Sequence, residues 1–342
     1  MDMQIWLNNL LKAPVKKAMP VLSFPCVSLM GITVRELIGS SDLQAKGMKL
    51  IADRADSAAS VSMMDLSVEA EAFGCAIRLS DHEVPTVTGV LIGSEADAEA
   101  LRVPAVGAGR TGRYIEAIQK ASELIADRPV FAGVIGPFSL AGRLMDVTEA
   151  LVNCYSEPDM VHICMKKTTA FLIEYIKAYK NTGAGGVVIA EPLTGLLSPA
   201  LAEEFSEPYV QEIVKAVQDN NFIVIYHNCG NNTVLMADSI LRTGASAYHF
   251  GNAIDMRDML THMPSDIVVM GNVDPAGQFK DGTPQFIYDD TLRVMNACCH
   301  DYPNFVISSG CDIPPAASWE NIDAFFSAVK AFYANPAFEK NN

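Results

Sequence analysis

One histidine and two cysteines are the side chains of this sequence best suited to hold a metal ion. His227 and Cys229 form an H-x-C pair directly after the apolar run Phe222–Tyr226, and Cys311 follows the apolar run that ends at Ser309. Because side chains alternate faces along a strand, His227 and Cys229 point the same way if the extended conformation continues. One imidazole and two thiolates are typical zinc ligands, and three protein ligands leave a fourth position free, as in catalytic zinc sites. The sulfur ligands argue against Mg²⁺ or Ca²⁺.

Cys229 and Cys311 are too far apart in the sequence for a zinc finger, so only a fold that gathers strand ends could unite them. The alternative is a structural role for each residue. A buried cysteine is usually a small core residue, and a histidine in a strand is usually a hydrogen-bonded core residue. The other six cysteines are scattered, and in a large chain free thiols or metal ligands are more common than disulfides.

Short apolar runs supply the strands that must carry these residues. Each run ends in Gly, Pro, Asn or Asp, and helix-length segments such as Met160–Asn181 and Pro208–Asn220 lie between most of them. The eight runs are Met19–Phe24, Ala58–Met64, Val130–Gly136, Gly186–Glu191, Phe222–His227, Ala247–Asn252, Ile267–Asn272 and Phe305–Ser309. Strands that are apolar on both faces and separated by helices predict a parallel sheet. Eight of them predict an α/β protein with a closed (β/α)₈ TIM barrel.

The stretch at about residues 65–129, between the second and third strands, is predicted to be an insertion in this barrel. It contains two short strands of its own, Ala76–Leu79 and Thr86–Leu91, and a helix near Thr111–Ile125. The sequence has no internal repeat and no low-complexity linker, so residues 1–342 are expected to form a single domain.

Polar residues at the other strand ends are candidates for substrate binding, because the chemistry of TIM barrels takes place at the C-terminal ends of the strands. These candidates are Asp65, Glu191, Asn252, Asn272 and Asp274. Each could equally cap a helix or stabilise a loop.

Composition narrows the class of protein. The formal net charge of −15 and the isoelectric point of about 4.8 disfavour binding to nucleic acid or to an acidic membrane surface. No apolar run is long enough to span a membrane, and the N-terminus lacks the basic region and cleavage site of a secretory signal. We therefore expect a cytoplasmic protein.

Three longer motifs resemble the uroporphyrinogen decarboxylase superfamily over nearly the whole chain, and more closely its methylcobalamin:coenzyme M methyltransferase branch. They are Gly136-Pro-Phe-Ser-Leu-Ala141, Leu197-Ser-Pro199 followed by Glu204-Phe205 and Pro208-Tyr209, and Gly271-Asn-Val-Asp-Pro275. The decarboxylases carry an arginine-rich segment near strand one that holds the acidic porphyrinogen, whereas residues 24–31 contain no arginine. The methyltransferase branch carries H-x-C on strand five and a cysteine after strand eight, as this chain does with His227, Cys229 and Cys311.

The resemblance implies that these three residues bind Zn²⁺ and form the catalytic site of a corrinoid:thiol methyltransferase. The methyl group would pass from methylcobalamin or another methylcorrinoid to a small thiol such as coenzyme M or homocysteine. The chain lacks the D-x-H-x-x-G pattern of corrinoid-binding domains, so the corrinoid is expected on a separate protein. The alternatives are a uroporphyrinogen decarboxylase-like lyase and a non-catalytic barrel that handles zinc or a corrinoid.

The chain departs from the branch near the end of strand six. Some members have an acidic residue there that completes the zinc shell, whereas this sequence has no carboxylate before Asp255. The fourth ligand is then expected to be water, His249 or Asp255. Arg143 and Arg78 are candidates to anchor the sulfonate of coenzyme M.

Overall fold

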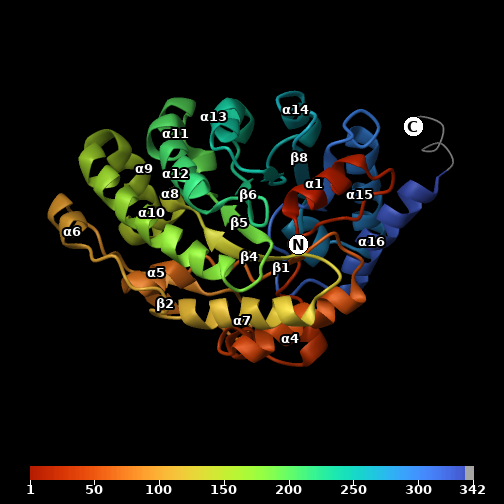
Figure 1. The fold of residues 1–342 in the computed structure, drawn as a ribbon, viewed down its shortest axis with the longest axis horizontal. Helices are drawn as coiled ribbons and strands as arrows, with labels where there is room; N and C mark the ends of the chain where they lie inside the picture. The colour runs from red at the N-terminus through yellow and green to blue at the C-terminus, as the bar shows by residue number, and fades with distance from the viewer. Residues whose placement is uncertain (336–342) are drawn as a thin grey trace.

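The computed structural model describes residues 1–335, which form a curled parallel sheet of seven strands with helices packed around it (Figure 1). The order across the sheet is β1-β4-β5-β6-β7-β8-β9, and every neighbouring pair is parallel. The strands are β1 (Ser60–Val61), β4 (Val130–Ile135), β5 (Gly186–Ala190), β6 (Ile223–Asn228), β7 (Ala247–Phe250), β8 (Val268–Val273) and β9 (Phe305–Ser309). The prediction of a parallel α/β sheet is confirmed, and each of seven of the eight predicted runs overlaps one of its strands.

The first predicted strand, residues 19–24, does not form a strand, so the prediction of eight strands is wrong in this detail. Its backbone nevertheless lies between the two edges of the sheet. The N–H of Met19 donates to the carbonyl of Ile307 in β9 at 3.0 Å, and the N–H of Ala58 donates to the carbonyl of Ala18 at 2.8 Å. Irregular chain therefore occupies the position where an eighth strand would close the barrel.

Helices cover the outer face of the sheet on all sides in Figure 1. The helices before β5 are α1 (Met3–Lys12), α2 (Cys26–Met30), α3 (Val34–Ile38), α4 (Ser41–Arg54), α5 (Val68–Phe73), α6 (Glu95–Ala100), α7 (Thr111–Leu124), α8 (Pro137–Met145), α9 (Val147–Ser156) and α10 (Pro158–Lys180). After β5 come η1 (Thr194–Leu196), α11 (Pro199–Phe205), α12 (Glu207–Val217), η2 (Thr233–Met236), α13 (Ala237–Arg242), α14 (Met256–Thr261), the π-helix η3 (Pro275–Lys280), α15 (Pro284–Cys298) and α16 (Trp319–Ala334). The two helices expected at residues 160–181 and 208–220 are α10 and α12.

The segment between β1 and β4 contains a small hairpin in addition to helices. Strands β2 (Ala76–Arg78) and β3 (Thr86–Thr88) pair antiparallel, and α7 packs against α4 beside the sheet (Figure 1). These elements correspond to the short strands and the helix that the sequence predicts within residues 65–129.

The interior of the sheet is filled by residues that alternate with outward-facing ones along each strand. On β6, Ile223 and Ile225 belong to the inner core, whereas Val224 and Tyr226 pack on the outer side against helices. Helix α1 adds its apolar stripe, which includes Leu7, to the same inner core, because its residues contact the inward side chains of the strands. The N-terminal end of the barrel is thereby closed by α1, which leaves the C-terminal end for chemistry.

Among residues 1–335, no helix combines the length and the apolar character needed to cross a bilayer.

Candidate metal centre

The structure brings together the three residues that the sequence marks as metal ligands. One potential ligand atom from each of His227, Cys229 and Cys311 lies within 4.8 Å of the other two. His227 is buried and both cysteines are half-buried. This is the only group of three or more His, Cys, Asp or Glu side chains within residues 1–335 with the geometry to hold a metal ion.

Strand alternation explains how β6 presents its ligand. Ile223 and Ile225 face the barrel interior, so His227, two residues further on, faces the same way. Cys229 follows directly after β6, and Cys311 follows two residues after β9. Both thiols therefore meet the imidazole at the C-terminal mouth of the barrel.

Close backbone packing holds this mouth together. A Cβ at Gly251, in the loop after β7, would lie 2.3 Å from the Cβ of Cys229 and 2.6 Å from its Cα. Such distances are impossible for real side chains, so only glycine lets this loop approach the cysteine. The loop after β7 therefore has no room for a side chain larger than glycine at position 251.

A chain of hydrogen bonds behind His227 fixes which of its nitrogens faces the thiols. Ser308 donates its only hydroxyl proton to the carbonyl of Met19 at 2.7 Å, so its oxygen must accept from His249 Nε2–H, also at 2.7 Å. Burial lowers the pKa of His249 well below its ordinary value, so its Nδ1 carries a lone pair. That nitrogen lies 2.7 Å from Nδ1 of His227, which therefore donates, with the carbonyl of His249 as a second acceptor at 3.2 Å.

This relay leaves Nε2 of His227 with its lone pair directed away from His249. Within residues 1–335 the atom is buried and has no nitrogen or oxygen hydrogen-bond partner, and the thiol of Cys311 is the group that faces it. A buried polar atom so weakly satisfied is costly unless a ligand binds it. Inward-facing histidine ligands in metalloproteins are typically held in this way, with the second nitrogen donating to a neighbour. The orphaned nitrogen is therefore the observation that best fits a bound metal ion.

The two thiols fit the same ion. They hydrogen-bond to each other, which lowers the pKa of Cys229 because the neighbouring S–H stabilises its thiolate. The same contact, together with burial, raises the pKa of Cys311 to about 12. A divalent cation between the sulfurs would take the place of the shared proton, and two thiolates with one imidazole suit Zn²⁺.

Neither protein side chain expected as a fourth ligand lies within the cluster. His249 stands behind His227, and both of its nitrogens are engaged there. Asp255 is exposed and caps α14 by accepting from the N–H of Arg257 at 2.8 Å. The fourth position is thus open to a ligand from outside the chain.

Asp65, a candidate for substrate binding, is held in a buried network of its own. Its carboxylate pairs with Arg110, and it accepts from the hydroxyl groups of Ser67 at 2.5 Å and Tyr114 at 2.8 Å. Arg110 also pairs with Glu71 at 2.6 Å. These contacts satisfy the carboxylate within the protein, and its role in substrate binding stays a prediction.

Glu191 is also fully buried and anchors the start of α8. It accepts from the backbone N–H groups of Phe138 at 2.8 Å and Ser139 at 3.0 Å, and from the hydroxyls of Ser139 and Thr194. Burial raises its pKa to about 7 despite these donors. The structure thus gives Glu191 the helix-capping role that the sequence left open, while a substrate role stays a prediction.

The last three candidates lie together at the C-terminal ends of β7 and β8. Asn252, Asn272 and Asp274 line a cavity of about 290 Å³ with Arg257 and Arg293 among the other lining residues. The amide of Asn272 donates to the carbonyls of Gly251 and Ile254, both at 3.0 Å. The carboxylate of Asp274 caps η3. Their substrate contacts also stay predictions, and Asn272 acts in the structure by fixing the Gly251 loop against Cys229.

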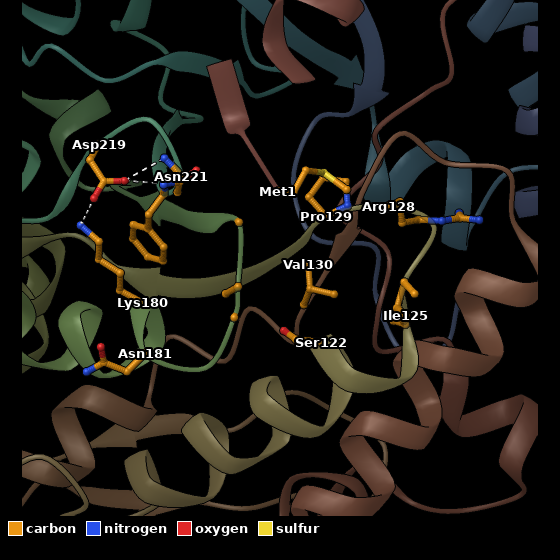
Figure 2. Close-up of a pocket in the computed structure, with 15 residues that line it drawn as sticks. Met1, Ser122, Ile125, Arg128, Pro129, Val130, Lys180, Asn181, Asp219 and Asn221 are labelled. Carbon is orange, nitrogen blue, oxygen red and sulfur yellow. Dashed lines mark hydrogen bonds and ion pairs between the residues drawn. The ribbon is translucent and has the colours of Figure 1, made fainter. Parts of the chain in front are cut away.

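A larger cavity of about 530 Å³ lies at the opposite end of the barrel (Figure 2). Its walls come from the N-terminal ends of β4, β5 and β6, and its charged side chains are already paired, as Lys180 is with Asp219 at 2.6 Å. Size alone does not make it the reactive site, because the candidate metal ligands His227, Cys229 and Cys311 are at the other end.

His249 and Ser308 complete the candidate site in a role that the sequence does not reveal. The sequence offers His249 only as a possible fourth ligand and does not mark Ser308. Alternation along the strands is the signal that could identify both residues. Ala247 on β7 and Val306 on β9 face the barrel interior, so His249 and Ser308, two residues further on, face it too.

Comparisons with known proteins agree with this architecture. The family model described as Uroporphyrinogen decarboxylase (URO-D) matches residues 13–332. The chain is similar to "Methylcobamide:CoM methyltransferase MtbA" of Methanosarcina acetivorans, at 27% identity over 78% of each chain. It is also similar to the uroporphyrinogen decarboxylase of Chlorobium luteolum, at 29% identity over 69% of this chain and 68% of that protein.

Solved structures share the fold. A methyltransferase from Methanosarcina mazei superposes with a TM-score of 0.84 at 24% identity, over 96% of this chain and 98% of that chain. A B12-independent methionine synthase from Shewanella superposes with a TM-score of 0.63 at 11% identity, over 94% and 96% of the two chains. The predicted resemblance to the superfamily and to its methyltransferase branch is confirmed, and the chain belongs to the uroporphyrinogen decarboxylase (URO-D) family.

Proposed function

We propose that this chain is a zinc-dependent methyltransferase that moves a methyl group from a methylcorrinoid, carried by a separate protein, to a small thiol. The observation that carries the proposal is the orphaned Nε2 of His227 beside the thiols of Cys229 and Cys311, with no fourth protein ligand in the described chain. An open fourth position is the arrangement of catalytic rather than structural zinc sites.

The chemistry follows from the ligands. A free alkyl thiol has a pKa of about 8.5 and is mostly protonated at neutral pH. Zinc bound to these three residues supplies Lewis acidity that favours the thiolate form of an acceptor at the open position. Cys229 and Cys311, as two thiolates, offset the charge of the ion, so the acceptor sulfur keeps its electron density for attack.

The overall reaction balances without a further reactant. The sulfur forms a bond to the methyl carbon, the cobalt–carbon bond breaks with its electron pair left on cobalt, and the thiol proton is released. The products are a thioether and the Co(I) corrinoid. His227 keeps its proton on Nδ1, held by His249, and is a ligand rather than a proton donor in this scheme.

The relatives include both methyltransferases and decarboxylases, and residues of this chain favour the first activity over the second. Residues 24–31 contain no arginine, so a porphyrinogen with many carboxylates would lack a basic clamp there. The carboxylate of Asp65, which follows β1, is neutralised by Arg110. The lack of a basic clamp does not affect the binding of a small thiol.

The test follows methylcobalamin absorbance with a panel of small thiols, using the full chain with and without zinc. We expect one zinc ion per chain and thiol-dependent demethylation, both lost in Cys311→Ser. Cys299→Ser is the matched control, because Cys299 is the other half-buried cysteine and lies outside the cluster. It should retain zinc and activity.

Two results would overturn the proposal. One is zinc-loaded protein that leaves methylcobalamin unchanged with every thiol in the panel. The other is turnover of uroporphyrinogen after complete removal of metal by a chelator, which would identify a lyase.

A further inference from the structure

We propose that Cys229 and Cys311 form a reversible redox switch, in which a peroxide joins the two thiols in a disulfide and so removes two of the three candidate metal ligands. The inference rests on the proposed function, because it describes the regulation of the same site. It is carried by the distance between the two sulfurs, by their position at the open mouth of the barrel and by the packing that holds them together.

The two sulfurs are close, although their segments are far apart in the sequence. The Sγ atoms of Cys229 and Cys311 lie within 4.8 Å of each other and of a nitrogen of His227. A disulfide has an S–S bond of about 2.05 Å, so a displacement of less than about 3 Å closes it. Cys298 and Cys299 are adjacent at the end of α15, but successive residues of a helix do not face each other.

Exposure also separates this pair from the other cysteines. Cys229 and Cys311 are half-buried at the C-terminal mouth, as the third half-buried thiol, Cys299, is at the end of α15. The remaining five thiols are buried, namely Cys26, Cys75, Cys154, Cys164 and Cys298. Oxidation selects accessible thiols, so a small peroxide that enters the mouth meets two thiols side by side.

Glycines in the surrounding loops hold the pair in place. A Cβ on Gly251 would lie 2.3 Å from the Cβ of Cys229 and 3.2 Å from the carbonyl oxygen of Gly310. A Cβ on Gly310, the residue before Cys311, would lie 2.7 Å from the backbone nitrogen of Asn252. The loop after β7 therefore packs against both segments that carry the cysteines. Each thiol is thus held beside the other, as an intramolecular reaction requires.

The oxidation balances with one molecule of hydrogen peroxide. The first thiol attacks one peroxide oxygen, the O–O bond breaks, and a sulfenic acid and one water form. The second thiol then attacks the sulfenic sulfur, so that the S–S bond forms, the S–O bond breaks and a second water leaves. The two thiols lose two electrons to the peroxide, and both thiol protons end in water.

The disulfide and a bound metal exclude each other. A cysteine binds zinc as a thiolate, and the disulfide leaves His227 as the single candidate ligand, which is too few for a stable zinc site. The hydrogen bonds from His227 to His249 and from His249 to Ser308 involve neither sulfur. The histidine side of the site therefore stays in place, and a dithiol restores the ligands by thiol–disulfide exchange.

The first experiment treats the zinc-free full chain with hydrogen peroxide and counts thiols in denaturant with a chromogenic disulfide reagent. All eight thiols should react before the treatment and six after it, because one disulfide consumes two of the eight. Peptide mapping should link Cys229 to Cys311. In the zinc-loaded protein, a chromophoric chelator should detect release of one zinc ion for each disulfide formed, and dithiothreitol should restore the thiol count and zinc binding.

Three variants separate the switch from general oxidation. Cys299→Ser is the matched control, because it removes the half-buried thiol outside the pair and should still form the disulfide. Cys311→Ser leaves Cys229 without its partner, so the peroxide should produce a sulfenic acid that dimedone traps and no internal disulfide. His227→Gln keeps both thiols, so it should still form the disulfide although its zinc binding is weakened.

The outcomes distinguish the switch from the proposed function. Sulfinic acid at Cys229 or Cys311, or disulfides that join other cysteines or other chains in place of this bond, would overturn the switch and leave the methyltransferase intact. Disulfide formation with zinc release in a protein that methylates no thiol would support the switch, and only the proposed function would fail. In a protein that methylates thiols, activity should fall in proportion to the disulfide and return with dithiothreitol, and activity that does not follow the disulfide would overturn the switch.

Discussion

Replacement of Ser308 by alanine is expected to weaken zinc binding, although Ser308 is not one of the three metal ligands. Its oxygen is the acceptor for the Nε2–H of His249, and His249 in turn accepts from the Nδ1–H of His227. Alanine leaves the His249 N–H buried and unpaired. The imidazole of His249 can avoid this only by moving its proton to Nδ1, where it opposes the proton on His227.

The size of the effect follows from this conflict. A buried donor without a partner costs about 1–3 kcal/mol. A tautomer exchange along the pair would avoid that cost but place the proton of His227 on Nε2, the nitrogen that faces the thiols. Zinc must reverse the exchange to bind, so the cost is subtracted from its binding free energy. We expect a Kd that is higher by about 10- to 100-fold, which matches the usual effect of residues that orient metal ligands.

The neighbouring residue provides a matched control. Ser309 is also fully buried on β9, and its oxygen accepts from the N–H of Val21 at 3.0 Å. Ser309→Ala therefore leaves a buried donor unpaired as well, but not in the His227 relay. Chemical denaturation of the zinc-free proteins should show similar losses of stability, whereas competition with a chromophoric chelator should show weaker zinc binding only for Ser308→Ala.

Equal zinc affinities in Ser308→Ala and wild type would refute the assigned direction of the hydrogen bonds. Equal weakening in both serine variants would show that general loss of packing, rather than the tautomer of His227, controls the affinity.

Three further perturbations test other parts of the structure. Gly251→Ala places a Cβ against Cys229 and should weaken zinc binding at least about tenfold, as judged by the same chelator competition. Glu69 is fully buried with one oxygen unpaired, and burial raises its pKa from 4.5 to about 8, so the folded protein binds the extra proton between these values and loses stability as pH rises through them. Glu69→Gln should remove up to about 5 kcal/mol of that loss by pH 8, measured by denaturation between pH 5 and 8. Leu7→Ala should cost about 2–4 kcal/mol in thermal or chemical unfolding, because it opens a cavity under α1, while zinc affinity stays the same.

Each of these expectations has a clear contrary result. Unchanged zinc affinity in Gly251→Ala would mean that the loop after β7 moves without disturbing the cysteine. A wild-type stability that rises between pH 5 and 8, or that falls equally in Glu69→Gln, would contradict the raised pKa. A Leu7→Ala variant with lost zinc affinity would show that α1 acts on the metal centre and not only on the core.

The part of the site that follows from local sequence was predictable. His227 and Cys229 are two residues apart on one strand, so alternation alone places them on one face, and strong apolar runs mark seven strands. The run at residues 19–24 failed as a strand although it is equally apolar. Pro20 has no backbone N–H, which removes a donor that a regular ladder needs.

The rest depends on distances between segments that no local pattern encodes. His227 lies opposite His249 because β6 and β7 pair in that register, and a shift of one residue would turn His249 outward. The sequence leaves Asp65 as a candidate for substrate binding because its ion-pair partner, Arg110, lies much further along the segment between β1 and β4. The need for glycine at position 251 comes from its close contact with Cys229, which the sequence does not show.

The closure of the barrel by α1 has a consequence for the order of events in catalysis. Within residues 1–335 the inner core beneath α1 seals the N-terminal end, so the candidate metal centre is reached from the mouth where Cys229 and Cys311 lie. A corrinoid protein delivering its methyl group must cover this same mouth. Under the proposed function the small thiol therefore has to enter first, and initial-rate kinetics should show an ordered ternary complex in which excess corrinoid protein slows loading of the thiol.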